Sequence, residues 1–243
     1  LEESLHRFLS QCPKTINEIA ELIDEHVESA TSEATDRPDE KTRFVSAGWC
    51  PTATWQEGYL FAVDLLRICQ ANLSLVDRIY LLETAFVIHV LRSMGMQSAR
   101  IGSDCNQLSG VGFLWAFSAP EEDREAIKRV SHHSVKATET MIYTAIRKAD
   151  LEHAEARKTI DGLRKDADKS YGGKLFLKLG KRIGLIIPRR GAGERFVLNE
   201  QILRFLVTTI VPLGGRLTFD TFKERAAARF GMVFDADGLA RSE

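Results

Sequence analysis

The spacing of apolar residues along the chain predicts a mainly helical protein. Over much of the sequence, apolar side chains return every three or four positions, which places them on one face of a helix. The pattern predicts helices over Leu1–Gln11, from Pro13 through Val27, over Trp55–Gln70 and over Ser74–Met94. Helical composition then continues from Ser118 to about Asp168, as one long helix or as two helices joined near Asp150.

Capping signals mark the ends of two of these helices. Thr15 and Glu18 form a T-x-x-E capping box, in which each side chain can accept a hydrogen bond from the other residue's free backbone N–H. Ser74 can cap the helix that follows it, and Asp77 suits the positive end of that helix dipole. Gly95 can end the same helix.

Two stretches lack the helical pattern. Glu28–Arg43 contains almost no apolar residue and is typical of an exposed linker. Gly102–Phe117 combines glycines with an apolar run, and its composition fits a buried loop and a short strand equally well.

A basic helix and a β-hairpin are predicted in the last third of the chain. Lys174–Arg182 has apolar residues on one helical side and basic residues on the others, and Gly184 can end it. The apolar runs Leu185–Ile187 and Arg195–Leu198 flank the turn Pro188–Glu194, whose glycines permit positive φ. A basic helix followed by a hairpin with arginines at its tip is typical of the closing half of a winged helix, a variant of the helix-turn-helix.

The remaining segment predicts a helix, a short strand and a second helix. Asn199 can cap an apolar helix over Ile202–Val211, Arg216–Thr218 fits a short strand, and Phe219–Phe230 is amphipathic. The residues of this last helix that we expect to face the core are Phe219, Phe222, Ala226 and Phe230. Those that we expect to face solvent are Lys223, Arg225 and Arg229.

These elements predict the fold class and a division into three parts. The fold is expected to be mainly α, with a helical N-terminal and middle region followed by a winged-helix-like C-terminal region that carries a β-hairpin. The parts are an acidic helical segment with its linker over residues 1–45, a helical domain over 46–168 and the winged-helix-like domain over 169–243.

Charge is distributed unevenly, although the net charge is only −1. Leu1–Phe44 contains eleven acidic and five basic residues, whereas Lys165–Arg195 contains nine basic and three acidic residues. A basic block of this kind indicates a polyanionic partner or a charged contact with another protein. The overall composition, 44% hydrophobic and 28% charged, is that of a globular protein.

The cysteines and the apolar runs favour a cytoplasmic protein. Four cysteines are scattered without a CxxC or any zinc-ligand spacing, which is typical of reduced thiols. They are Cys12, Cys50, Cys69 and Cys105. The apolar run Phe86–Leu91 is interrupted at Arg92, far short of a membrane span, and the first residues lack a secretory signal pattern.

Histidines and cysteines do not form a catalytic pattern. His132 and His133 are adjacent on a predicted helix, so their side chains diverge by about 100° and cannot form the i, i+4 pair of a metal site. We expect both of them to be solvated. His89 lies among apolar residues and is typical of a core histidine, and no pattern links a histidine to Cys50.

Three short motifs resemble functional motifs, but the surrounding sequence does not support a functional site at any of them. Pro38–Lys41 has the letters of a nuclease motif but lies in the polar linker rather than on core strands. Asp235–Gly238 begins like a calcium loop and lacks the later acidic ligands. Gly191 and Gly193 lie in a hairpin that is too short to begin a dinucleotide-binding helix. We therefore predict no catalytic residue, no metal ligand and no cofactor.

Three segments carry a resemblance to a known group of proteins. They are GLIIPRRGAGERFVL, LNEQILRFLVTTIVPLGGRLTFDTFKERAAARFG and LSLVDRIYLLETAFVIHVLRSMG. They resemble segments of large accessory proteins of bacterial DNA-modification and anti-phage defence systems, mainly over the last third of the chain. The resemblance implies a non-catalytic helical and winged-helix subunit that works beside a nuclease, a helicase, a methyltransferase or an SMC-like ATPase.

The basic helix and the hairpin are the predicted functional site. We expect a non-enzymatic subunit of a DNA-targeting defence or modification complex that contacts the backbone of DNA or RNA. The predicted phosphate contacts are Lys174, Lys178, Lys181, Arg182, Arg189 and Arg190. One alternative is an adaptor whose acidic N-terminal helices and charged helix near Glu152–Asp168 dock a larger catalytic partner without contacting DNA. The other is an ordinary surface whose lysines and arginines are merely solvated.

Overall fold

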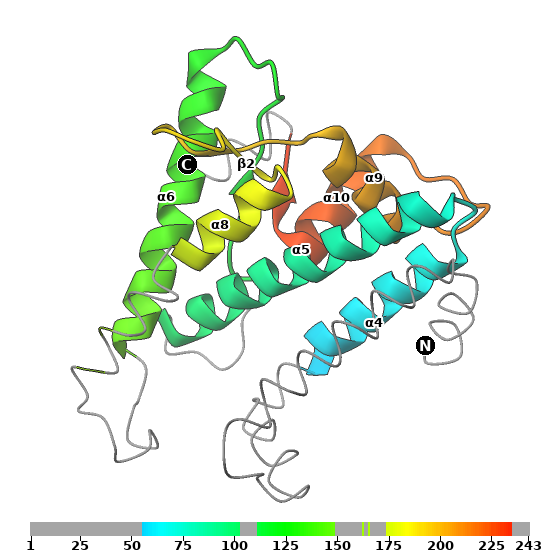
Figure 1. Cartoon of the computed structure of the whole chain (residues 1–243), viewed down its shortest axis with the longest axis horizontal. Coiled ribbons are helices and arrows are strands. Elements are labelled where there is room, and N and C mark those ends of the chain that lie inside the picture. The colour runs from blue at the N-terminus through cyan, green and yellow to red at the C-terminus, as the bar shows by residue number, and fades with distance from the viewer. Residues whose placement is uncertain (1–54, 103–110, 149–161, 163–164, 166–173, 235–243) are drawn as a thin grey trace, which may run out of the picture. The chain divides into compact units, whose positions relative to one another are not determined.

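The computed structural model describes residues 55–102, 111–148, 162, 165 and 174–234 (Figure 1). These residues form six helices and four strands of two residues each, so the protein is mainly helical, as the sequence predicts. The chain divides into two compact units, Leu1–Arg78 and Ile79–Glu243. The three-part division drawn from the sequence stays a prediction.

Several predicted features lie outside the described residues. They are the helices over 1–11 and 13–27, the linker Glu28–Arg43, the charged helix near Glu152–Asp168, the motifs at Pro38–Lys41 and Asp235–Gly238, and Cys12, Cys50 and Cys105.

The first unit contains helix α4, Trp55–Gln70, at the predicted bounds. The next helix, α5, spans Leu75–Gly102, and Ser74 caps it as predicted. The Ser74 hydroxyl accepts a hydrogen bond from the backbone N–H of Asp77 at 3.1 Å and donates one to the Asp77 carboxylate at 2.6 Å. In α4, Cys69 is buried, and burial raises the pKa of its thiol, which keeps it protonated as a small apolar side chain.

Helix α5 does not end at Gly95, and the prediction of a helix end there was wrong. Gly95 is buried because the ring of Phe113 packs against it. A Cβ added at Gly95 would lie 2.8 Å from the Cε1 atom of that ring. This glycine therefore permits close packing, which the helix spacing alone does not reveal.

Among the described helices, α5 is the one that could cross a membrane by its length and composition. Half of the 18-residue window concerned is buried inside the protein, as in the core helix of a soluble protein. The buried face of α5 also carries His89, Arg92 and Ser98. His89 is the core histidine that the sequence predicts, and its ring meets that of Phe230 edge-on, with centroids 6.0 Å apart.

Two short strand pairs lie in the core of the second unit. Strand β1, Trp115–Ala116, pairs in parallel with β4, Met232–Val233, and β2, Ile186–Ile187, pairs antiparallel with β3, Arg195–Phe196. A parallel bridge between Ser118 and Val197 connects the two pairs. The predicted hairpin is therefore present, and the stretch Gly102–Phe117 contains a strand in its last residues.

An aromatic cluster centred on Trp115 fills the space beside these strands. Trp115 is fully buried, and its ring centroid lies 4.8 Å from that of Phe113 and 5.4 Å from that of Phe196. Phe176, from the helix before the hairpin, lies 6.0 Å from the same tryptophan. This cluster holds together segments that are distant in the sequence, since burial of large aromatic surfaces dominates core energetics.

Helix α6, Glu125–Lys148, packs against β1 and β3 through serine hydroxyls. The Ser131 hydroxyl donates to the carbonyl oxygen of Phe196 at 2.7 Å. The Ser134 hydroxyl accepts the backbone N–H of Ala116 and donates to the carbonyl oxygen of Leu114, both at 3.0 Å. These serines add hydrogen bonds to buried backbone groups of β1, β3 and Leu114; the carbonyl oxygen of Phe196 also accepts from the backbone N–H of Ser118 at 3.1 Å.

Helices α9, Glu200–Ile210, and α10, Phe219–Phe230, complete the second unit. The Asn199 side chain caps α9 by accepting the N–H of Ile202 at 2.8 Å, as predicted. The predicted strand Arg216–Thr218 is absent, because Thr218 instead caps α10.

The outward and inward faces of α10 differ from the prediction at three positions. Lys223 is half-buried rather than outward, with its side chain 23% exposed. Phe219 is 65% exposed rather than inward, because it stands at the first position of the helix, beyond the core. Arg229 is half-buried rather than outward: its guanidinium donates to the carbonyl oxygen of Thr209 at 2.8 Å, and its own carbonyl oxygen accepts from Arg92 at 2.5 Å. Each of these two arginines thus places a cation at the negative end of a helix.

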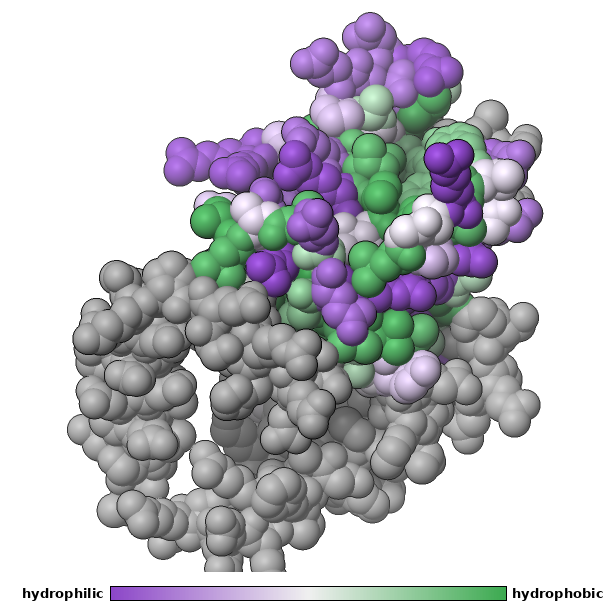
Figure 2. Space-filling view, turned by 90° about the vertical axis from the view of Figure 1, so that its right-hand side faces the viewer, coloured by the Kyte–Doolittle hydropathy of each residue, from purple (hydrophilic) through white to green (hydrophobic). Residues whose placement is uncertain are grey.

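Apolar side chains are also present on the surface of the second unit. Leu203, Val207 and Leu213 are between 41% and 56% exposed. On the face in Figure 2, hydrophobic residues are interspersed with hydrophilic ones. Scattered apolar residues of this kind are normal on a folded protein.

Candidate nucleic-acid interface

The predicted site is formed by helix α8, Lys174–Arg182, together with the β2–β3 hairpin. Phe176 is fully buried, which anchors one face of this short helix in the aromatic cluster. Gly180 is also buried, and a Cβ there would lie 2.6 Å from the Cδ1 atom of Ile186, so the helix lies directly on β2. Gly184, at φ 71°, ends the turn after the helix. The basic face of α8 is therefore held at a fixed place beside the hairpin.

Four of the six predicted contact residues are exposed and have no partner among the described residues. They are Lys174 and Lys178 on α8 and Arg189 and Arg190 in the hairpin turn. Arg182 is different, because its side chain forms an ion pair with Glu83 of α5 at 3.1 Å. That side chain is 72% exposed, and an exposed pair of this kind contributes only about 0–1 kcal/mol.

Lys181, the sixth predicted contact residue, is turned toward Glu194, the last residue of the hairpin turn. The two side chains are 20% and 15% exposed, and their charged atoms lie 3.1 Å apart. The other carboxylate oxygen of Glu194 lies 3.9 Å from the ammonium group of Lys136 on α6. Glu194 thus connects the hairpin to both helices, and it engages a cation that the sequence assigns to phosphate binding.

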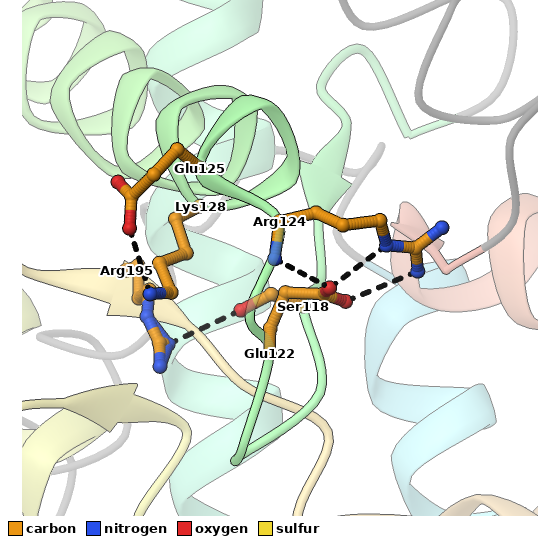
Figure 3. A network of polar contacts seen from close by, with 6 residues as sticks. All are labelled: Ser118, Glu122, Arg124, Glu125, Lys128 and Arg195. Atoms are coloured by element: carbon orange, nitrogen blue, oxygen red, sulfur yellow. Dashed lines mark hydrogen bonds and ion pairs between the residues drawn. The ribbon is translucent and has the colours of Figure 1, made fainter.

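Arg195 also holds the hairpin in place rather than facing outward. Its guanidinium donates to the carbonyl oxygen of Pro120 at 3.1 Å and to the hydroxyl of Ser118 at 3.4 Å. Figure 3 shows Arg195 turned toward Ser118 beside the start of α6. The neighbouring ion pairs drawn there are Arg124 with Glu122 at 2.9 Å and Lys128 with Glu125 at 2.8 Å.

His132 contacts the same part of the hairpin, so the prediction that both histidines are solvated was wrong for this one. Its Nδ1 atom lies 2.7 Å from the carbonyl oxygen of Glu194, and Nδ1 must carry the proton because a carbonyl oxygen can only accept. His133 is exposed, as predicted. The ring centroids of the two histidines lie 6.1 Å apart, with the ring planes inclined by 48°.

Sequence reasoning missed Glu194 as a determinant of the site. The available signal was weak: Glu194 is one of only three acidic residues in Lys165–Arg195, and it directly follows the glycines of the turn. Which lysine it would engage depends on the packing of α8 against the hairpin. That packing cannot be deduced from spacing along the chain.

The pKa of Glu194 is lowered by its own backbone N–H and by the ammonium groups of Lys181 and Lys136. A carboxyl whose folded-state pKa is lowered stabilises the fold fully above its unfolded pKa of about 4.3, and this stabilisation is lost as the pH falls through the folded value. We therefore expect the stability of Glu194→Gln to decline less steeply with acid than that of the parent protein. Urea unfolding at a series of acidic pH values measures this difference.

The matched control for this experiment is Glu224→Gln, which removes an exposed carboxylate from α10. It should follow the parent curve. Parallel curves for the parent and Glu194→Gln would contradict the role of Glu194 as a charged connection between α8, α6 and the hairpin.

Comparisons of the chain with protein-family models, with curated proteins and with solved structures found no match. The resemblance to accessory proteins of defence systems therefore stays a prediction. In the part of the chain that the structure describes, no group of three or more His, Cys, Asp or Glu side chains is arranged to hold a metal ion.

Proposed function

We propose that this protein is a non-enzymatic, cytoplasmic subunit of a bacterial DNA-targeting defence or modification complex. In this proposal α8 and the β2–β3 hairpin act as the helix and wing of a winged-helix-like region and bind the nucleic-acid backbone. The hairpin follows α8 directly and packs on it, an arrangement that supports this interpretation.

The observation that carries the proposal is the set of unpaired cations on this surface. Lys174, Lys178, Arg189 and Arg190 have no carboxylate partner among the described residues, so a phosphate can bind them without breaking an ion pair. The surroundings are also basic. Lys174–Phe234 contains twelve Lys and Arg residues against four Asp and Glu residues.

The shape of the turn adds support. Gly191 and Gly193 adopt φ values of 97° and 87°, which side chains rarely tolerate. A Cβ at either glycine would meet nothing within 4 Å, so both face open space. The turn that presents Arg189 and Arg190 thus leaves room for another molecule to approach its backbone closely.

Reversal of the two turn charges tests the proposal. We expect Arg189→Glu/Arg190→Glu to weaken binding to labelled DNA by about tenfold or more at low salt and to reduce the salt slope by about two, since each lost phosphate contact removes about 0.9. Fluorescence anisotropy of the purified chain at several salt concentrations measures both quantities.

The matched control is Arg216→Glu/Arg225→Glu, which changes the net charge equally at two exposed arginines outside α8 and the hairpin. An equal loss of affinity in the control would show a general charge effect and contradict a localised site. If the parent chain does not bind DNA even at low salt, the proposal fails, and the adaptor alternative becomes the function to test.

A further inference from the structure

We infer that the ligand of the surface formed by α8 and the hairpin is double-stranded rather than single-stranded DNA. The inference rests on the proposed function and specifies its substrate class. It follows from the kinds of side chain that this surface offers and from those that it keeps buried.

Aromatic side chains on this surface are not accessible for stacking. Lys174–Leu198 contains two aromatic residues, Phe176 and Phe196, and both are fully buried. Phe196 stacks on Trp115 at 5.4 Å, and Phe176 meets Phe196 edge-on at 6.2 Å, so both rings belong to the core. Surfaces that bind single strands rely on aromatic stacking, which strengthens binding by roughly tenfold or more per base. That contribution is missing here.

Neutral side chains that both donate and accept hydrogen bonds are missing as well. Between Lys174 and Arg195 the polar side chains are lysines, arginines and Glu194, without a single Asn, Gln, Ser or Thr. Sequence-specific recognition of single strands uses hydrogen bonds to the exposed edges of unstacked bases. Lysine and arginine only donate, and the carboxylate of Glu194 is engaged by Lys181 and Lys136, so the edges of unstacked bases find no free side-chain acceptor here.

Cations that act on phosphates alone favour the ligand with the higher charge density. Duplex DNA carries one negative charge per about 1.7 Å of its axis, counting both strands, and each neutralised phosphate releases more counterion than in a single strand. Lys174 and Lys178 come from a helix and Arg189 and Arg190 from the turn of the hairpin that packs on it, so two elements present exposed cations on this surface.

One exposed aromatic residue on α6 supplies a control. Tyr143 is 39% exposed, and the guanidinium of Arg147 lies 4.3 Å from its ring centroid, which covers one face of the ring. If a single strand were bound by stacking on this ring, Tyr143→Ala would weaken single-strand binding selectively. We expect this variant to bind both forms of DNA as the parent does.

The experiment compares a labelled duplex with one of its own strands, at equal length, by anisotropy with the full chain. We expect the duplex to bind at least about tenfold more tightly and with the steeper salt slope, about 0.9 against 0.7 per phosphate. An unrelated duplex sequence should bind within about threefold of the first, since phosphate contacts carry no sequence information.

Equal or tighter binding of the single strand would overturn the inference and leave the proposed function standing. Loss of single-strand affinity in Tyr143→Ala would overturn it as well, because stacking would then contribute. Absence of binding to either form would overturn both the inference and the proposed function.

Discussion

Trp115→Ala is expected to lower the free energy of unfolding by about 3–5 kcal/mol, the range for removing a large aromatic side chain from a packed core. Trp115 is fully buried, and three phenylalanine rings lie within 6.0 Å of its ring centroid. Alanine would leave a cavity where β1, β3 and α8 meet. Urea unfolding followed by circular dichroism measures the loss without depending on tryptophan fluorescence.

Trp115→Phe separates ring packing from the indole N–H. The Nε1 atom of Trp115 is buried and has no hydrogen-bond partner among the described residues. Phenylalanine removes this unpaired donor and keeps most of the ring contacts, so we expect a loss below about 1.5 kcal/mol. Equal losses for the two variants would contradict the argument that ring packing is what Trp115 contributes.

Gly231→Ala is expected to destabilise the fold by about 2–4 kcal/mol, through backbone strain and overpacking together. Gly231 ends α10 at φ 69°, a conformation that favours glycine. A Cβ there would also lie 2.8 Å from both the Cε2 atom and the backbone oxygen of Phe113. The side chain of Phe113 could shift, but its backbone is fixed next to β1. Urea unfolding of the parent protein and of Gly231→Ala measures the difference in the free energy of unfolding.

Gly214→Ala is the matched control, because this glycine has the same φ of 69° and an added Cβ would meet nothing within 4 Å. Backbone strain alone should lower its free energy of unfolding, by about 1–2 kcal/mol. The difference between the two variants isolates the contact with Phe113. A difference near zero would show that Phe113 yields and that the close packing contributes little.

Local signals predicted the elements of the fold well. The caps at Ser74 and Asn199 act within three residues of the chain, and both are observed. The bounds of α4 and the antiparallel hairpin also follow from short-range patterns. In each case the interaction that fixes the element lies inside the window in which the pattern can be read.

Features set by distant partners could not be predicted. The position of Gly95 predicts a helix end, yet the glycine is needed there because the ring of Phe113 packs against it. The helical pattern predicts that Arg229 is exposed, yet its guanidinium donates to Thr209 and its carbonyl oxygen accepts from Arg92. A sequence pattern specifies which residues can face a core, while the identity of the neighbour across the core comes from tertiary packing.

At the candidate site, too, the exposure of some cations follows from local sequence, while the pairing of others is set by tertiary packing. The exposure of Lys174, Lys178, Arg189 and Arg190 could be predicted from their places on the basic face of a helix and in a turn. The pairing of Arg182 with Glu83 could not, because 99 positions separate the two residues in the chain. Pairing by an acidic residue is what distinguishes a cation available to a phosphate from one engaged in the fold.

The parallel pairing of β1 with β4 also has a consequence for the order of events during synthesis. The backbone N–H groups of Trp115 and Phe117 donate to Gly231 and Val233, which follow far later in the chain. Because contacts between distant positions require a long loop to close, this pair is expected to form late. Until Val233 has left the ribosome, β1 remains an open edge with apolar residues beside it, the kind of surface that nascent-chain chaperones cover.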